Sequence, residues 1–243
     1  MLEVQDLSAL RLHHLGFSLH PGEILGFGGL AGQGHRELFL TLFGAARPSG
    51  GRILLGGRPV RIRSPREAKS RGIRLALVPE DRKTEGLLLG MSVRDNLTLS
   101  ILDRISRLSI LRPGAERRPA EDTVRQLAVR AAGINTPVGT LSGGNQQKVL
   151  LGRWLLTDPR ILLFYDVTRG VDVATKHEIY ELMTRLVAEG RAVLVYSSDA
   201  QELAELCHRV LVMREGRVAA ELTAPHITAE QIVAAAVHER IAA

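Results

Sequence analysis

The stretch 141–148, Leu-Ser-Gly-Gly-Asn-Gln-Gln-Lys, constrains this chain more than any other part of its sequence. Ser142 is a residue type that caps helix N-termini, and an apolar run at helical spacing follows over 149–156. Gly143 and Gly144 leave backbone N–H groups accessible at the positive end of the predicted helix. The stretch therefore predicts an anion-binding site, whereas Ser-Gly-Gly alone would be more typical of an ordinary capped helix.

A second glycine-rich stretch lies near the N-terminus, between a predicted strand over 23–27 and a predicted helix over 37–43. Strand, glycine-rich loop and helix in this order are the context of a phosphate-binding P-loop, whose spacing is G-x-x-x-x-G-K-[ST]. The chain keeps this spacing from position 29 to position 36 but lacks the last two residue types. The predicted nucleotide-binding positions are Gly29, Gly32, Gly34, His35 and Arg36.

The two altered positions of this loop weaken it for chemistry. His35 replaces the lysine and is mostly neutral at pH 7, unless bound phosphates raise its pKa. Arg36 replaces the Ser/Thr and has no acceptor for Mg²⁺, although its guanidinium could bind a phosphate if it pointed inward. The loop is thus expected to hold phosphate through backbone N–H groups; the alternative is a tight turn that binds nothing.

Composition limits the class of protein. With 243 residues, 45% of them hydrophobic, the chain can bury one large core. The net charge of +6 is typical of nucleic-acid binding, but the basic residues are scattered and lack interleaved aromatic rings, so no nucleic-acid partner is expected. The lone Cys207 fits a reducing compartment, and no signal peptide, membrane span or histidine metal spacing is expected.

Three further stretches follow predicted buried strands. Residues 79–83, Pro-Glu-Asp-Arg-Lys, follow the strand over 73–78, and the run Asp-Val-Thr-Arg-Gly-Val-Asp over 166–172 follows the strand over 160–165. Ser197-Ser198-Asp199 follows the strand over 191–196. Between these motifs, 103–118 is expected to be a surface loop and 119–132 a helix that stops at Gly133.

In this order the motifs resemble those of ATP-binding-cassette (ABC) ATPases, over nearly the whole chain. The run 79–83 is similar to the second cassette of bacterial sugar-import ATPases of the ribose, galactose and xylose type. The resemblance implies an α/β P-loop NTPase fold with a mixed central sheet, an antiparallel β subdomain and a helical subdomain that carries the signature motif. It implies one nucleotide-binding domain over 1–243, with the helical subdomain at about 92–156.

The resemblance also assigns roles to single positions. Glu80 stands where the family has the Q-loop glutamine, and Tyr165 stands at the Walker B aspartate. Asp166 replaces the catalytic glutamate, and Ser198 replaces the switch histidine, while Asp172 keeps the aspartate of the D-loop. The signature residues that would contact a partner's ATP are Leu141, Ser142, Gly143, Gly144, Asn145 and Gln146. No ring lies in 2–11, where the family's adenine-stacking residue is expected.

Cassettes of this family bind ATP between two copies, each site joining one P-loop to the other's signature. The resemblance therefore implies a chain with a degenerate P-loop site, inactive or very weak alone, whose signature completes the ATP site of a second cassette with an intact P-loop. Mg²⁺ is expected only in that partner's site. The implied setting is the cytoplasmic face of the plasma membrane, as a peripheral subunit on permease subunits supplied by an extracytoplasmic sugar-binding protein.

Two alternatives remain open from the sequence. One is a regulatory or binding module that kept the fold but lost transport, which failure to associate with any permease would favour. The other is a basic nucleic-acid-binding protein, which a salt-dependent affinity for duplex or single strands would favour.

Overall fold

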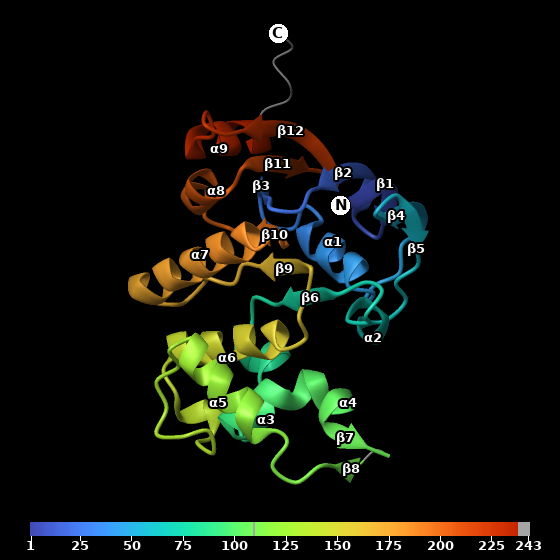
Figure 1. Cartoon of the computed structure of the whole chain (residues 1–243). Helices are drawn as coiled ribbons and strands as arrows, with labels where there is room; N and C mark the ends of the chain where they lie inside the picture. Colours follow the sequence, from blue (N-terminus) through green and yellow to red (C-terminus); the bar gives the residue numbers. More distant parts are fainter. Residues whose placement is uncertain (109, 238–243) are drawn as a thin grey trace. The chain divides into compact units, whose positions relative to one another are not determined.

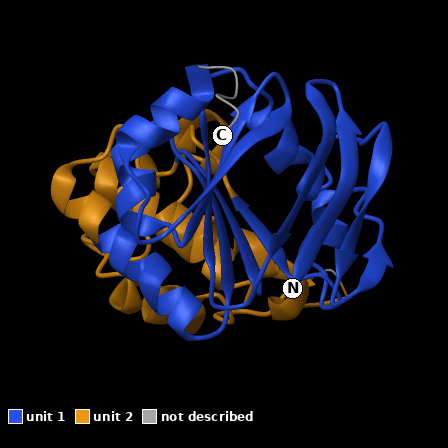
Figure 2. Ribbon diagram, turned by 90° about the horizontal axis from the view of Figure 1, so that it is seen from above, with its two compact units in different colours: residues 1–77, 160–166, 178–243 blue, residues 78–159, 167–177 orange. Residues whose placement is uncertain are grey.

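The computed structural model describes residues 1–108 and 110–237. The chain forms two compact units, coloured separately in Figure 2. Unit 1 comprises Met1–Leu77, Arg160–Asp166 and Glu178–Ala243, and unit 2 comprises Val78–Pro159 and Val167–His177. Residues 92–156 fall within unit 2; that the whole chain works as one domain stays a prediction.

Unit 1 contains the two larger sheets, whose strands are labelled in Figure 1. Its strands are β1 (Leu2–Ala9), β2 (Leu12–Leu19), β3 (Ile24–Gly29), β4 (Gly50–Leu55), β5 (Arg58–Val60), β6 (Leu75–Val78, whose last residue belongs to unit 2), β9 (Ile161–Tyr165), β10 (Ala192–Tyr196), β11 (Arg209–Arg214) and β12 (Arg217–Thr223). Its helices are α1 (His35–Leu42), α2 (Pro65–Ala68), α8 (Ala200–Leu206) and α9 (Ala229–Val237), and α7 (Val173–Ala188) lies in it from Glu178 onward.

The strands form an antiparallel sheet of order β2-β1-β4-β5 and a mixed sheet of order β12-β11-β3-β10-β9-β6. In the mixed sheet the pairs β11–β3, β3–β10 and β10–β9 are parallel, and β12 pairs antiparallel with β11. The parallel strands are continuous apolar runs because both of their faces are buried. This architecture confirms the predicted α/β cassette fold with its mixed and antiparallel sheets.

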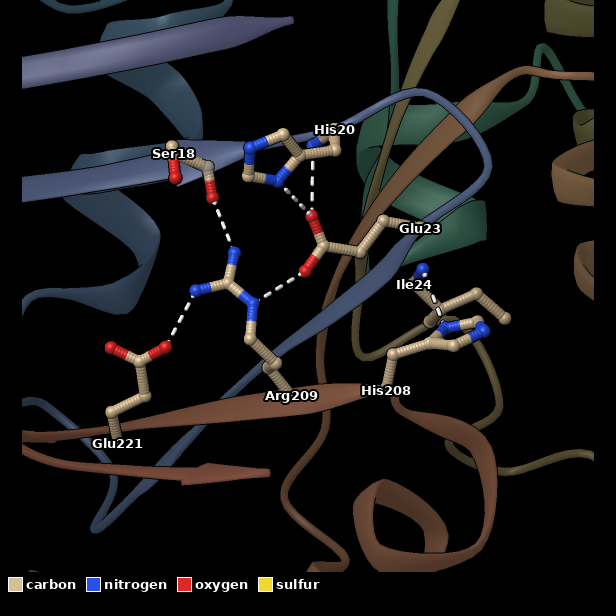
Figure 3. Close-up of polar contacts among 7 residues, drawn as sticks. All are labelled: Ser18, His20, Glu23, Ile24, His208, Arg209 and Glu221. Carbon is tan, nitrogen blue, oxygen red and sulfur yellow. Dashed lines mark hydrogen bonds and ion pairs between the residues drawn. The ribbon is translucent and has the colours of Figure 1, made fainter. Parts of the chain in front are cut away.

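A polar cluster ties four strands of unit 1 together at one end (Figure 3). Arg209, the first residue of β11, donates from Nε to Glu23 Oε1 at 2.6 Å and from Nη1 to Glu221 Oε1 at 2.6 Å. Its Nη2 donates to the carbonyl oxygen of Ser18 in β2 at 2.7 Å. The other oxygen of Glu23 accepts from the backbone N–H of His20 at 2.8 Å and lies 3.0 Å from His20 Nδ1.

Unit 2 is mainly helical in its described residues. It contains α3 (Val93–Thr98), α4 (Leu102–Ile105), α5 (Arg117–Gln126) and α6 (Gly143–Leu155), with a π-helical turn at Arg82–Gly86, 3₁₀ turns at Leu99–Ile101 and Val138–Thr140, and the two-stranded hairpin β7 (Ser106–Arg107) and β8 (Ile110–Leu111). Ser92 caps α3, accepting from Asp95 N–H at 3.1 Å.

A buried arginine organises the interior of unit 2. Arg153 of α6 donates from Nε to Asn96 O at 2.7 Å and from Nη2 to Asn96 Oδ1 at 2.6 Å, and its Nη1 contacts Gly86 O. Burial lowers the pKa of Arg153 to about 10, so its guanidinium is still charged at neutral pH. One side chain of α6 thereby holds the π-helical turn and α3, since the charged hydrogen bonds offset the cost of burying it.

Two expectations for unit 2 are wrong. The region 103–118 is not a plain loop, because it forms α4 and the β7–β8 hairpin. The helix predicted over 119–132 ends at Gln126, and Ala128 turns the chain with a φ of +48°. This turn buries Val129 and lets the N–H of Arg130 donate to Asn145 Oδ1 at 2.7 Å, so a tertiary contact overrides helix propensity.

In the part of the chain that the structure describes, no helix combines the length and the apolar composition needed to cross a membrane.

Candidate functional site

The P-loop of unit 1 joins β3 to α1. Gly34 precedes α1 with a φ of +100°, and a Cβ there would lie 2.7 Å from the carbonyl oxygen of Arg11. Only glycine fits this position, because the left-handed backbone and the neighbouring carbonyl both exclude a side chain. Strand, glycine-rich loop and helix thus occur where the sequence predicts them, with Gly29, Gly32 and Gly34 all at positive φ.

The side chain of His35, the first residue of α1, is buried against β3 and β10. His35 is 2% exposed, its Nε2 lies 3.0 Å from Gly28 O, and its ring centroid lies 4.4 Å from that of Tyr196. Burial lowers the pKa of His35, and the hydrogen bond to Gly28 offsets only part of this effect. The imidazole is therefore neutral at pH 7, and because Gly28 O accepts, Nε2 carries the proton. No positive charge stands at the lysine position, and Arg36 is exposed on the first turn of α1.

Tyr165 and Tyr196 fill the space next to His35. Their rings stack with centroids 4.8 Å apart and an interplanar angle of 19°, and Phe39 of α1 meets Tyr165 edge-on at 5.5 Å. The row Phe39, Tyr165, Tyr196, His35 therefore joins α1 to the ends of β9 and β10. Sequence reasoning missed Tyr196; its signal is that both tyrosines end apolar strands, and the structure pairs them across neighbouring parallel strands.

Asp166, which is predicted to replace the catalytic glutamate, is bound by Ser198, which is predicted to replace the switch histidine. Its Oδ1 accepts from the N–H of Ser198 at 3.1 Å and from Ser198 Oγ at 3.2 Å. The backbone N–H of Asp166 donates to Tyr196 O at 2.8 Å. Asp166 is 3% exposed and has a φ of +51°. The carboxylate thus holds the loop after β10, and a short side chain in this position does not reach outward.

The residues at these positions do not fit a magnesium ion. Mg²⁺ requires oxygen ligands from the P-loop hydroxyl and the Walker B carboxylate, and here those positions hold a guanidinium and a stacked phenol ring. Asp166 is the remaining carboxylate, and its Oδ1 already accepts the two Ser198 hydrogen bonds. Within the described residues no group of three His, Cys, Asp or Glu side chains is placed to hold a metal.

The signature stretch lies in unit 2 and starts α6. Ser142 caps the helix: its Oγ accepts from the N–H of Asn145 at 3.4 Å and from Asn145 Nδ2 at 2.8 Å. Gln146 is 5% exposed and donates from Nε2 to Leu141 O at 3.1 Å, which orders the loop before the helix. The predicted N-cap and the predicted helix are confirmed, and the helix begins at Gly143.

Both signature glycines have close neighbours. A Cβ at Gly144 would overlap Thr175 Oγ1 and lie 3.2 Å from Asp172 Oδ2, and a Cβ at Gly143 would lie 2.7 Å from Arg82 Nη2. Asp172 accepts from the N–H and the Oγ1 of Thr175, each at 2.9 Å, and these hydrogen bonds lower the pKa of its carboxyl. Glycine is required at 144 because the D-loop approaches the helix end too closely for a side chain, whereas the close neighbour of Gly143 is the flexible end of Arg82.

Glu80, at the Q-loop position, forms an ion pair with Arg169 inside unit 2. Both residues line a cavity of about 280 Å³ together with Asp81, Arg82 and Lys83. The Glu80 carboxylate is therefore engaged with a neighbouring guanidinium of its own unit.

The predicted site residues fall into two groups. Unit 1 brings together the P-loop positions 29–36, Tyr165, Asp166 and Ser198, and unit 2 brings together Glu80, Asp172 and the signature positions 141–146. In unit 1 Asp166 contacts Ser198, and His35 and Tyr165 both pack on Tyr196. In unit 2 the signature keeps a helix end capped by the exposed Ser142. Arg82 and Thr175, which sequence reasoning missed, belong to the second group.

The chain matches one family model and several named relatives. The family model described as ABC transporter matches residues 12–169, more than half of the chain. The protein named ribose import ATP-binding protein RbsA 1 of Rhizobium johnstonii is 50% identical over 239 residues, which are 98% of this chain and 47% of the relative. A putative ribose/galactose/methyl galactoside import ATP-binding protein of Rhizobium meliloti is 43% identical over 96% of the chain and 46% of the relative. The chain spans about half the length of these relatives.

Solved structures share the fold. A nucleotide-free ATP-binding cassette from an ABC transporter superposes with a TM-score of 0.80 at 18% identity, covering 92% of this chain and 91% of the other. The CbiO1 component of the Clostridium perfringens CbiONQ transporter gives a TM-score of 0.78 at 22% identity, covering 95% of this chain and 91% of the other. From the family match, the relatives and the fold, the chain belongs to the ABC transporter family, as one of its ATP-binding domains.

Proposed function

We propose that this chain is the second, degenerate cassette of a bacterial sugar importer, and that it completes a partner's ATP site without hydrolysing ATP in its own. The partner is a second cassette with an intact P-loop, and both act on permease subunits at the cytoplasmic face of the membrane, supplied by an extracytoplasmic sugar-binding protein. ATP is the ligand, and Mg²⁺ is held by the partner's residues.

The contrast between the two groups of site residues carries this proposal. Position 35 is a buried neutral histidine, the Walker B position is a ring stacked on Tyr196, and Asp166 is hydrogen-bonded by Ser198. His35 is neutral, Tyr165 supplies no carboxylate and Asp166 Oδ1 already accepts two hydrogen bonds, so these positions are poorly suited to a Mg·ATP complex. The signature helix end instead presents the N–H groups of its first turn beside two glycines, which favours a phosphate brought by another chain.

The relatives support both a sugar as the transported substrate and the pairing with a second cassette. The name of one relative refers to import of ribose, and the name of the other refers to import of ribose, galactose and methyl galactoside. This chain spans about half the length of each. A related fold has been seen as a dimeric ATP-binding cassette in a post-hydrolysis state with ADP and Pi, with a TM-score of 0.76 at 18% identity over 92% of this chain and 98% of the other. Half-length coverage and dimeric relatives both favour a chain that works against a second cassette rather than a module without transport.

The test measures steady-state ATP turnover of the chain alone and mixed with a cassette chosen for the Lys and Ser/Thr of an intact P-loop. We expect negligible turnover alone and clear turnover in the mixture. Ser142→Arg should abolish turnover in the mixture, since the arginine would occupy the space over the α6 N-terminus where the partner's terminal phosphate must lie.

Ser64→Arg is the matched control. Ser64 also caps a helix, accepting from Glu67 N–H at 3.2 Å, but it lies on α2 in unit 1, so the variant loses a cap without touching the signature. It should leave turnover of the mixture within about twofold, as capping changes cost about 0.5–2 kcal/mol of stability rather than activity. Unchanged turnover with Ser142→Arg would contradict the proposal.

A further inference from the structure

Arg82 lies against the first residue of the signature helix. Its Nη2 is 2.7 Å from the position that a Cβ on Gly143 would take, and the guanidinium carbon is 3.5 Å from it. The same Nη2 donates to Gly170 O in the loop before Asp172, at 3.4 Å. Arg82 therefore links the Q-loop, the D-loop and the signature at one point of unit 2.

The charge at this point has one carboxylate near it, because hydrogen bonds from Thr84 and Lys83 and, to a smaller extent, the charge of Arg82 lower the pKa of Asp81. Among the described residues Arg82 forms no ion pair, and its buried Nε has no hydrogen-bond acceptor. The neighbouring acids are engaged elsewhere: Glu80 pairs with Arg169, and Asp81 Oδ1 accepts from Lys83 N–H at 2.8 Å and Thr84 N–H at 3.2 Å. Asp172 lies by Gly144, and its two oxygens accept from Thr175.

Placing this guanidinium here is unfavourable for the chain alone. The N-terminus of α6 carries a partial positive charge, and a cation beside it is repelled, where an acidic side chain would be attracted. A buried N–H without an acceptor adds a further cost. Both costs are reduced if an anion binds at the edge of the guanidinium that lines the cavity, next to the helix end.

We propose that Arg82 is a phosphate-binding residue of the signature site, where its guanidinium contacts the terminal phosphate of the nucleotide held by the partner cassette. This rests on the proposed function, in which the signature completes the partner's ATP site. Arg82 supplies to that phosphate the positive charge that the backbone N–H groups of Gly143 and Gly144 supply only in part. Its fork of N–H donors suits phosphate oxygens better than a lysine would.

The test uses ATP turnover in the mixture of the chain with an intact-P-loop cassette. Arg82→Ala should lower kcat about tenfold or more, while KM changes less than about threefold, because the partner's P-loop still binds most of the nucleotide and Arg82 acts on developing charge. Arg82→Lys should give an intermediate kcat, since it keeps the charge and loses the fork.

Lys83→Ala is the matched control, since Lys83 is exposed and lines the same cavity, so the variant changes net charge equally without touching Gly143. Its kcat should stay within about twofold of the unaltered chain. Arg82→Ala should also not lower the urea midpoint for unfolding of the isolated chain, because it removes a repelled cation. A lowered midpoint would assign Arg82 a structural role and overturn the phosphate role.

The outcomes separate this proposal from the one on which it rests. If Ser142→Arg abolishes turnover and Arg82→Ala does not change it, the role of Arg82 is overturned and the function of the signature stands. If Ser142→Arg leaves turnover unchanged, or the mixture does not turn over ATP, both fall. Equal losses with Arg82→Ala and Lys83→Ala would point to net charge and would also overturn the assignment of Arg82.

Discussion

His35 illustrates how one substitution changes the chemistry of a whole loop. A lysine at this position would need solvent or phosphate to solvate its charge. The imidazole can be neutral, so it can be buried against β3 and β10, where it bonds Gly28 O and packs on Tyr196. Once it is buried there, the same burial that lowers its pKa keeps it from serving as a phosphate-binding cation. His35 therefore stabilises the fold and does not bind phosphate as a cation.

The burial of His35 predicts a pH effect on stability. Its folded pKa lies below the unfolded value of about 6.5, so the unfolded chain binds the proton first and stability is lost as pH falls below about 6.5. Between pH 7.5 and 5.5 this group should remove up to about 1.4 kcal/mol of unfolding free energy. Urea titrations at both pH values should show a smaller difference for His35→Gln than for the unaltered chain; equal differences would contradict the assignment.

Among the structural elements, the strand ends do most to position the site. The register of β10 against β3 and β9 sets Tyr196 beside both Phe27 and Tyr165, so the loops after these strands meet at the carboxyl edge of the sheet. At the opposite ends, the cluster of Figure 3 fixes β2, the start of β3, β11 and β12 to one another through Glu23 and Arg209.

This strand-end cluster predicts a measurable stability change. Burial raises the pKa of Glu23, but the hydrogen bonds from Arg209 and His20 outweigh it, so its net pKa lies below the usual value. Its stabilisation is thus present above about pH 4.3 and is lost as pH falls through the folded pKa. Glu23→Gln should cost about 1–3 kcal/mol of unfolding free energy at pH 7, measured by urea titration.

The control for the strand-end cluster is Glu189→Gln. Glu189 pairs with Arg191 at 3.3 Å but its side chain is 59% exposed, so its loss should change the unfolding free energy by less than about 0.5 kcal/mol. A Glu23→Gln variant as stable as this control would show that the cluster does not hold the strands.

For the whole molecule, the proposed division of labour between the units concerns nucleotide binding. Unit 1 keeps a P-loop without ligands for Mg²⁺, and unit 2 keeps the signature with Asp172 and Arg82 beside it. The chain is thereby suited to respond to a nucleotide that another cassette holds.

This division predicts how the isolated chain binds nucleotide. If its P-loop holds ATP, it does so through backbone N–H groups, and the affinity for a fluorescent ATP analogue should be the same within about twofold with Mg²⁺ and with EDTA. Titrating Tyr165→Asp in parallel tests the cause, because a carboxylate at this position restores an oxygen ligand and should make binding stronger with Mg²⁺. An unaltered chain whose binding requires Mg²⁺ would contradict the absence of metal ligands.

The sequence by itself determined the family, the order of the motifs and the fold class, because glycine spacing, helix capping and apolar strands are local signals. The N-cap at Ser142 could be predicted for the same reason. The end of α5 could not, since Val129 and the Arg130–Asn145 hydrogen bond depend on chain segments brought together only by folding.

The same holds for the candidate site. The substitutions at His35, Tyr165, Asp166 and Ser198 were visible in the sequence, but only the tertiary structure decided what they do. Strand register stacked Tyr165 on Tyr196, and the turn after β9 aimed Asp166 at Ser198, both from residues more than 30 positions away. The role proposed for Arg82 likewise could not be predicted from the sequence. It depends on the position of Arg82 against Gly143, because electrostatic repulsion and close approach depend on distance in space, not on spacing along the sequence.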